Sequence, residues 1–221
     1  MTRSDLRTRI LEALGESTTA PIFWSSSQMN DLIDEAQEVL AEEAAQIKRT
    51  AYVPLKNGTT YYRLRAIDPN AMTPYRIYTR HNERRLTVAT VMELFNRHQR
   101  WISVNSDPES WFPISWDMFG IFPSPSTGGG IMEINYLSWP RPLADDDDEP
   151  EFPQADHEGL VLYGVYEGLL KRWDITRATE LFTFFMDRWG DSRIRSGTDK
   201  IKSRDFQRSR SKVGFRAGTT F

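Results

Sequence analysis

The sequence has no cysteine among its 221 residues, so disulfides, thiolate metal sites and cysteine nucleophiles are excluded. It has no apolar run near the roughly 20 residues that a membrane helix needs. The first ten residues lack the apolar core and cleavage site of a signal peptide. These absences predict a chain with no membrane segment that is made in the cytoplasm.

Motifs that carry common catalytic chemistry are also missing. The histidines at 81, 98 and 157 lie far apart, and none has a second histidine at metal-ligand spacing. The glycine run 128–130 lacks the following Lys-Ser/Thr of a phosphate-binding loop, and there is no Gly-x-Ser-x-Gly elbow. We therefore expect no enzymatic activity, no cofactor and no metal, although a carboxylate pair assembled only by the fold stays open.

What is present is a globular composition with an uneven charge. Hydrophobic residues make up 39% and charged residues 27% of the chain, which is typical of a folded protein. The net charge is -3, but residues 188–221 contain ten basic and three acidic residues and carry +7, so the rest carries -10. A basic tail on an acidic body predicts a tail that docks on an acidic partner, which can be nucleic acid, another protein or a neighbouring copy.

Two helices are predicted at the N-terminal end. Thr2 and Asp5 form a capping box that opens a helix over residues 2–14, and Gly15 ends it. Aromatic residues at 23 and 24 are expected in the core. Ser25 and Gln28 form a second capping box, and the helix that follows has an apolar stripe at Met29, Leu32, Ile33, Ala36, Leu40 and Ile47. Its acidic opposite face is expected to be solvated, with a metal or partner surface as the alternative.

The apolar period changes from helical to alternating near Thr50, which predicts an antiparallel β subdomain of six or seven short strands. Residues 56–59 (KNGT) predict a hairpin turn between the first two strands, and 81–83 a second one. A short amphipathic helix is expected over 90–98. The Gly-rich segment 124–130 is expected to be a tight hairpin turn, and 131–139 to be the strand that closes the sheet.

The proline-bounded segment that follows contains six acidic residues, at 145–149 and 151. Like charge and proline exclude a strand or a helix interior, so we expect a solvated crossing loop. A calcium site is the alternative, but the turn glycine and the bidentate glutamate of a calcium-binding helix-loop-helix are absent.

Two further helices are predicted, over residues 156–173 and, after the N-cap Asp174, up to Gly190. Gly159, Gly164 and Gly168 each disfavour a helix by about 1 kcal/mol relative to alanine, so they predict close approach of another helix or another subunit. The aromatic stripe of the last helix is expected at the core or at a subunit interface; it comprises Phe182, Phe185 and Trp189.

Beyond Gly190 the apolar period ends, and residues 191–221 are expected to be disordered or extended until a partner orders them. Two functions fit this pattern. In one, the chain is a nucleic-acid-binding accessory protein whose Arg-rich tail neutralises phosphates while Phe206 or Phe215 stacks on bases. In the other, it is a structural adaptor whose body packs against copies of itself while the tail reaches into a neighbour.

The order of these features resembles the head-to-tail adaptor (connector) proteins of tailed bacteriophages over about residues 1–190. The resemblance rests on the segment WSSSQMNDLIDEAQEVL, on the Phe122-Pro123-Ser124-Pro125 step before a Gly-rich hairpin, and above all on NYLSWPRPLADDDDEPEFPQADHEGLVLYGVYEGL. In that family a last strand, Pro-x-Pro-Leu, an acidic linker, proline and a helix pair follow one another in this order.

The resemblance implies an α+β fold with a four-helix bundle body, a β-rich insertion and an extended C-terminal tail. We place the bundle at 1–50 and 154–190, the inserted antiparallel β subdomain at 51–140, the acidic linker at 141–153 and the basic tail at 191–221. It also implies a virion protein of the neck that forms a ring of twelve, binds the portal protein and the tail or nozzle proteins, has no enzymatic activity, and lets DNA pass through its channel without sequence-specific binding. The residues expected to dock on the portal are Arg193, Arg195, Lys200, Lys202, Arg204, Phe206, Arg208, Arg210, Lys212 and Phe215.

Overall fold

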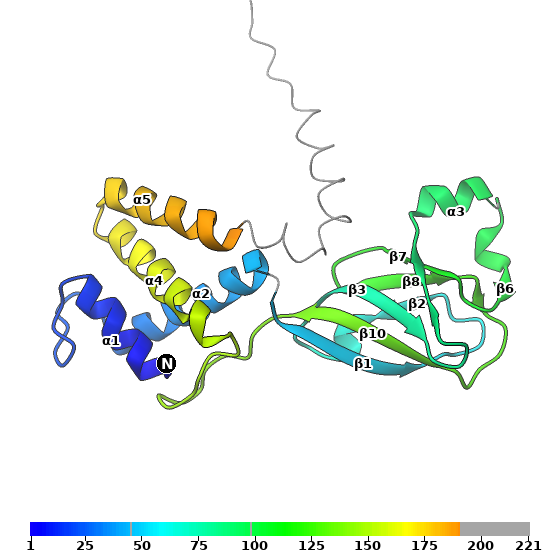
Figure 1. Ribbon diagram of the computed structural model, residues 1–221, viewed down its shortest axis with the longest axis horizontal. Coiled ribbons are helices and arrows are strands. Elements are labelled where there is room, and N and C mark those ends of the chain that lie inside the picture. The colour runs from blue at the N-terminus through cyan, green and yellow to red at the C-terminus, as the bar shows by residue number, and fades with distance from the viewer. Residues whose placement is uncertain (45, 98, 191–221) are drawn as a thin grey trace, which may run out of the picture.

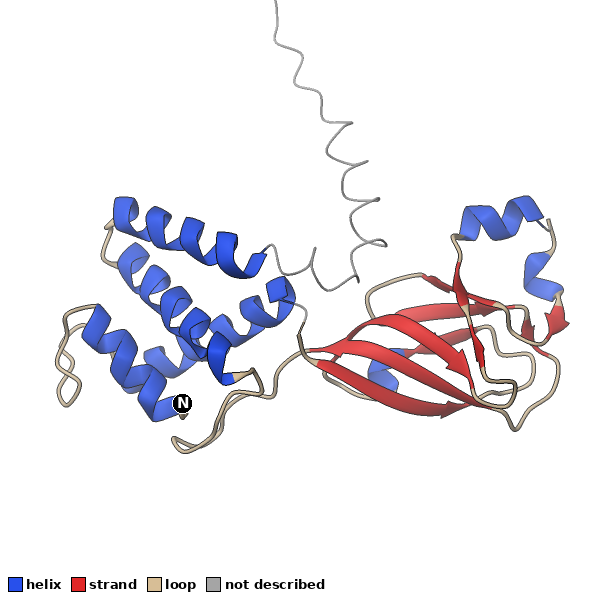
Figure 2. Ribbon diagram, in the orientation of Figure 1, coloured by secondary structure: helices blue, strands red, loops and turns tan. Residues whose placement is uncertain are grey.

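The computed structural model describes residues 1–44, 46–97 and 99–190. Within these ranges the chain folds as two parts that lie side by side (Figure 1). We call residues 1–47 and 140–190 the helical part and residues 48–139 the β part. Figure 2 shows nearly all helix on one side and all strand on the other. The predicted α+β class is confirmed.

Four α-helices and a terminal π-helical turn build the helical part around one hydrophobic core. The elements are α1 (Arg3–Ala13), α2 (Ser26–Ala44), α4 (His157–Lys171), α5 (Ile175–Phe185) and the turn Met186–Gly190. α4 packs against α1, α2 and α5, whereas α5 packs mainly on α4 and α2 meets the π-helical turn. The four helices thus share a core, but a regular four-helix bundle is not established by these contacts.

Local signals define the ends of the first two helices. The Thr2 hydroxyl accepts a hydrogen bond from the Asp5 amide at 3.3 Å, and the Asp5 carboxylate accepts one from the Thr2 amide at 3.0 Å. Ser25 and Gln28 make the same reciprocal pair at 3.2 and 3.1 Å. Gly15 adopts φ +70°, the left-handed conformation that ends α1. Both predicted capping boxes and the predicted stop are confirmed.

The two aromatic residues before α2 have different environments. Trp24 is 4% exposed and belongs to the core, as expected, but Phe23 is 46% exposed. The Lys171 ammonium lies 3.8 Å from the Trp24 ring centroid and 5.4 Å from that of Phe23. The prediction of burial was wrong for Phe23, because its ring packs beside cationic side chains at the surface.

Two four-stranded sheets and a two-stranded ladder form the β part around a second core, which includes Ile77, Trp111, Phe119 and Ile134. The first sheet, sheet A, has the order β1 (Lys48–Pro54), β10 (Ile131–Ser138), β3 (Ala71–Thr79) and β4 (Arg84–Arg85). The second, sheet B, has the order β2 (Tyr61–Arg63), β8 (Met118–Phe122), β7 (Ser110–Pro113) and β5 (Thr87–Val88). The ladder pairs β6 (Asn105–Ser106) with β9 (Ser124–Pro125). The short helices of the β part are α3 (Val91–Arg97) and the 3₁₀ turns Leu64–Ala66 and Trp101–Ser103. A further 3₁₀ turn, Gln154–Asp156, precedes α4 in the helical part.

Strand pairing in the β part differs from the sequence-based expectation. β1 pairs with β10 along seven residues and β2 pairs with β8, so no hairpin joins β1 to β2. Gly58 does make a turn with φ +68°, but that turn carries the chain from one sheet to the other. The expected hairpin was wrong because a turn signal reports a local change of direction and not which strands pair afterwards.

β10 lies at the centre of its sheet, between β1 and β3, and so does not close it at an edge. The Gly-rich segment 124–130 joins β9 to β10, which do not pair with each other, so the hairpin expected there was wrong too. The hairpin expected at 81–83 is confirmed, because β3 and β4 flank that loop and pair antiparallel. The pairs β5–β7 and β6–β9 are parallel, which makes the β part mainly rather than wholly antiparallel. The last strand in sequence is central because it pairs with both neighbours over almost its full length.

Candidate interaction surfaces

The acidic linker, residues 141–153, lies against the N-terminal end of α1. The Arg3 and Ser4 amides donate to the carbonyls of Asp148 and Asp146 at 2.9 and 3.1 Å. The Asp148 carboxylate in turn accepts from the amides of residues 144 and 145, at 2.8 Å each. Leu143 and Phe152 anchor the two ends of the linker in the helical core. The expected crossing loop is confirmed, and most of its acidic side chains are exposed. The sequence did not indicate that the linker also supplies acceptors to α1 amides that have no partner within their own helix.

The carboxylates of the linker do not all have partners within the chain. Arg7 binds Asp146 through a close ion pair, and its hydrogen bond lowers the pKa of that carboxyl below the usual range. The side chains of Asp145 and Asp147 are exposed and form no ion pair with any residue that the structure describes. A loop held by backbone hydrogen bonds therefore presents two free negative charges.

A network of charges joins the helical part to the β part. Arg49, at the start of β1, lies 3.5 Å from Asp68 and 2.8 Å from Glu151 of the linker. The Tyr136 hydroxyl donates to Asp68 at 2.7 Å. Burial alone would raise the pKa of Asp68, but the hydrogen bonds from Tyr136 and from the Asn70 amide, together with the charge of Arg49, hold it below its usual range. Burial, and then the Asp68 carboxylate, raise the pKa of Tyr136 to about 12.

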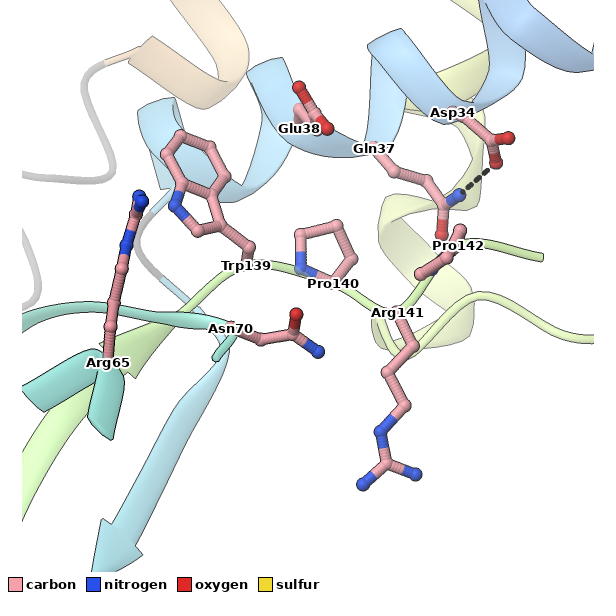
Figure 3. Close-up of a pocket in the computed structure, with 9 residues that line it drawn as sticks. All are labelled: Asp34, Gln37, Glu38, Arg65, Asn70, Trp139, Pro140, Arg141 and Pro142. Atoms are coloured by element: carbon pink, nitrogen blue, oxygen red, sulfur yellow. Dashed lines mark hydrogen bonds between the residues drawn. The ribbon is translucent and has the colours of Figure 1, made fainter. Parts of the chain in front are cut away.

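A pocket of about 410 Å³ lies at the same joint (Figure 3). Its lining comes from α2, from the segment before β3 and from the chain after β10; it comprises Asp34, Gln37, Glu38, Arg65, Asn70, Trp139, Pro140, Arg141 and Pro142. The Gln37 amide donates to Asp34 at 3.1 Å. Two carboxylates, two guanidinium groups and an indole suit a polar peptide segment, but they include no nucleophile paired with a base.

The three glycines of α4 all lie at close contacts within the chain. A Cβ on Gly159 would lie 3.0 Å from the Trp189 indole, and one on Gly164 would lie 2.6 Å from Cδ1 of Ile10. A Cβ on Gly168 would lie 2.7 Å from a methyl carbon of Leu14. The glycines let α1 and the π-helical turn approach α4, so one copy of the chain already uses this face.

The aromatic stripe predicted for the last helix is also placed largely within the chain. Phe185 and Trp189 are 1% and 2% exposed and stack with centroids 5.5 Å apart. Phe182 packs on Tyr166 at 4.9 Å but keeps 36% of its surface exposed. Of the three residues proposed for a subunit interface, Phe182 alone retains an exposed face.

Metal-binding clusters and membrane helices were sought among the described residues. Groups of three or more His, Asp or Glu side chains with metal-site geometry do not occur in residues 1–44, 46–97 and 99–190. In the same ranges, no helix has the length and apolarity that crossing a membrane requires.

The histidines that the structure describes have separate partners. His81 lies 3.8 Å from Asp107, and the buried His157 ring forms a hydrogen bond with the Phe152 carbonyl at 3.0 Å. His98 and all ten proposed portal-docking residues, at 193–215, lie outside the described residues.

The two described parts of the molecule differ in charge as strongly as the basic tail differs from the rest of the chain. The helical part has 8 basic and 21 acidic residues and carries -13, whereas the β part has 11 basic and 7 acidic residues and carries +4. Sequence reasoning missed this difference and the Arg49 network. The alternation of Arg76 and Tyr78 in β3, with Arg80 directly after it, was a signal for an exposed basic face, because residues two apart share a face of a strand.

Comparison with known proteins places this architecture in a family. The family model described as SU10 adaptor protein matches residues 1–209, which covers the helical part, the β part and most of the basic tail. A search of curated proteins finds no match. Because the match extends over nearly the whole chain, the protein belongs to the SU10 adaptor protein family, a family of phage head-to-tail adaptors.

Proposed function

We propose that this protein is a structural component of a phage virion that assembles as a ring of twelve beneath the portal and joins the portal to the tail. The observation that carries the proposal is the family match over residues 1–209. In this proposal the function is geometric. The helical part forms the ring wall, the β part offers a platform to tail or nozzle proteins, and neither carries out catalysis.

The contacts between the helical part and the β part support a role in which the two parts are held in a fixed orientation. Arg49 connects β1 to both Asp68 and Glu151, and the chain passes between the parts twice, at residues 46–48 and at 139–141. A two-stranded connection clamped by ion pairs resists bending better than a single linker would. This suits a protein that must hold one binding surface at a fixed angle to another.

The acidic helical part supports a channel that DNA passes without being gripped. A wall carrying -13 per copy repels phosphates, so DNA would slide past it without sequence-specific contacts. The β part, at +4, is the side that would attract acidic surfaces of other proteins. We assign the ring wall to the helical part for this reason.

Docking on the portal is assigned to the basic tail. Residues 191–221 contain nine basic and three acidic residues, including Arg193, Arg195, Arg208 and Arg210, together with three phenylalanines that can anchor in pockets. The exposed face of Phe182 on α5 is proposed to contribute to contacts between neighbouring copies in the ring.

Electron microscopy of particles carrying a labelled copy tests the position and the symmetry. The expected result is a twelve-fold ring between portal and tail. Density elsewhere in the particle, or no incorporation of the label, would contradict the proposal.

Portal docking is tested separately with two variants, one that lacks the tail and one that keeps it with a lower charge. Deletion of residues 191–221 should leave a folded body that no longer binds purified portal rings. A full-length chain with Arg193, Arg195, Arg208 and Arg210 changed to glutamine keeps the tail but lowers its charge, and should bind less strongly. Unchanged portal binding by the deletion variant would refute the assignment.

A further inference from the structure

Arg76 and Arg85, at the edge of sheet A, line a surface hollow that has no Asp or Glu in its lining. The hollow measures about 300 Å³ and is lined by Tyr75, Arg76, Arg85, Leu86, Thr87, Val88 and Trp111. Both arginine side chains are exposed, and neither guanidinium group forms a hydrogen bond or an ion pair with any described residue. By contrast, the neighbouring Arg80 binds Glu133 and Arg84 lies 3.4 Å from Glu109.

The register of the strands brings the two guanidinium groups to the same face. Tyr78 of β3 is paired with Arg85 of β4, and Arg76 lies two residues before Tyr78 on the same face of β3. Side chains in this diagonal relation have Cα atoms about 7–8 Å apart, within reach of one shared ligand. Two uncompensated cations so close repel each other, and a carboxylate between them removes the repulsion while accepting paired N–H bonds.

The same chain carries a loop of matching charge. In the acidic linker Asp145 and Asp147 are exposed and form no ion pair within the described residues. The loop is already fixed by the bonds from the Arg3 and Ser4 amides and by the Asp148 carboxylate, so little ordering entropy would be lost when it binds.

The two surfaces lie on opposite sides of the joint between the parts. The linker packs on α1 in the helical part, whereas β4 pairs with the end of β3 that lies farthest from that joint (Figure 1). They therefore cannot meet within one copy. A contact between unlike surfaces of two copies repeats head to tail and closes into a ring when the rotation between copies allows it.

We propose that Arg76 and Arg85 bind the Asp145 and Asp147 carboxylates of a neighbouring copy. This contact rests on the proposed ring and names one of its interfaces. Arginine and tyrosine are enriched at protein interfaces, and the lining of the hollow contains Arg76, Arg85 and Tyr75 and no lysine. The occupant is thus a carboxylate loop of this chain, with a nucleic-acid phosphate as the competing outcome of the test.

The absence of cysteine makes cross-linking a clean test. The full chain with Arg85→Cys is mixed with the full chain with Asp147→Cys under oxidising conditions, and disulfide-linked heterodimer is measured. Arg97→Cys, an exposed arginine on α3 in the same part, replaces Arg85→Cys in the control pair. We expect a yield on the order of tenfold above the control, falling with added salt, since a tenfold preference needs no more than a few ion pairs. Equal yields from the two pairs would overturn the proposal.

Charge reversal provides the second arm. Arg76→Glu/Arg85→Glu and Asp145→Arg/Asp147→Arg should each prevent incorporation into rings, and the chain carrying all four changes should recover it. If the fourfold variant assembles no better than either double variant, the pairing is wrong.

A fluorescent DNA duplex separates the competing occupant. Loss of duplex binding in Arg76→Glu/Arg85→Glu, together with cross-linking at the control level, would assign the site to phosphate instead. Particles that show the ring by microscopy while cross-linking stays at the control level would refute this contact and leave the proposed function intact.

Discussion

The helical part and the β part each contain a glycine that faces a crowded space, but the neighbour differs in its freedom to move. A Cβ on Gly164 of α4 would lie 2.6 Å from Cδ1 of Ile10, the free end of an aliphatic chain. A Cβ on Gly120 of β8 would lie 2.5 Å from Cε2 and 2.7 Å from Cε1 of Phe112, a buried ring. An aliphatic end can rotate away, whereas an enclosed ring cannot. The comparison indicates that the contact at Gly164 can adjust more readily than the contact at Gly120.

The two parts also differ in charge. The helical part carries -13 and the β part +4. A ring needs a wall whose copies fit one another, and a platform whose shape stays fixed for a partner. The division of properties therefore agrees with the roles proposed for the two parts.

The largest expected effect, and the strongest test of the difference between the two glycine contacts, is that of Gly120→Ala. Because the Phe112 ring is held edge-on by Tyr61 and Trp101, the added methyl has no space, and we expect a loss of about 3 kcal/mol in the free energy of unfolding. Urea unfolding followed by tryptophan fluorescence measures it. Gly128→Ala, whose Cβ would have no neighbour closer than 3.8 Å, is the matched control and should stay within about 0.5 kcal/mol of the parent.

Adding Phe112→Leu to Gly120→Ala identifies the cause. If ring contact is responsible, the double variant is more stable than the sum of the single changes predicts. An unchanged stability for Gly120→Ala alone would show that the β part yields as readily as the helical part.

The next effect appears on raising the pH. The pKa of Tyr136 is about 12 in the folded chain and about 10 when unfolded, so the folded state favours the protonated hydroxyl. The contribution of the protonated Tyr136 hydroxyl to the free energy of unfolding is fully present below pH 10, and it is lost as the pH rises through 12. Two pKa units correspond to about 2–3 kcal/mol of unfolding free energy, most of which should disappear between about pH 10 and pH 12.

Tyr136→Phe isolates this contribution. The variant should be less stable than the parent at pH 8, because Asp68 loses its hydrogen bond, and it should lose less stability on going to high pH. Tyr61→Phe, at an exposed tyrosine of β2, is the control and should follow the parent. Parallel curves for the parent and Tyr136→Phe would contradict the assignment.

A smaller effect is expected for Gly164→Ala in the helical part. Alanine gains about 1 kcal/mol of helix propensity, while overpacking against Ile10 costs about 1–3 kcal/mol, so the net loss should be about 1 kcal/mol. Ile10→Val removes the methyl group that would collide. The double variant should therefore be more stable than the two separate losses predict, and strict additivity would exclude the contact as the cause.

The helical part could be predicted from the sequence better than the β part, because its defining contacts join residues that are close along the chain. Helix ends in the helical part depend on residues three apart, so Thr2 with Asp5 and Ser25 with Gln28 could be identified directly. The glycines Gly159, Gly164 and Gly168 indicated close approach, and only the identity of the neighbour was missing. The β part depends on pairs such as Lys48 with Leu137, and no local signal encodes a partner so far along the chain.

The candidate interaction surfaces also differ in how well the sequence alone could predict them. The basic and acidic segments could be read from charge counts, but the Arg49 network and the hollow below Arg76 and Arg85 depend on which strands are neighbours. The acidic linker was expected to be solvated because its carboxylates dominate the sequence, whereas its backbone carbonyls make the contact with α1.

The least stability change, and the most direct test of how the two parts are linked, is expected from Arg49→Ala. The Arg49 side chain is 22% exposed and its two ion pairs are partly screened, so the loss should be about 1 kcal/mol or less. Arg63→Ala, which removes a 3.7 Å pair with Asp117 wholly within the β part, is the matched control. Arg49→Ala should increase the spread of molecular dimensions measured by small-angle X-ray scattering, and Arg63→Ala should not. If both variants scatter like the parent, the ion pairs do not hold the angle, and the two chain crossings with the Trp139 packing must do so instead.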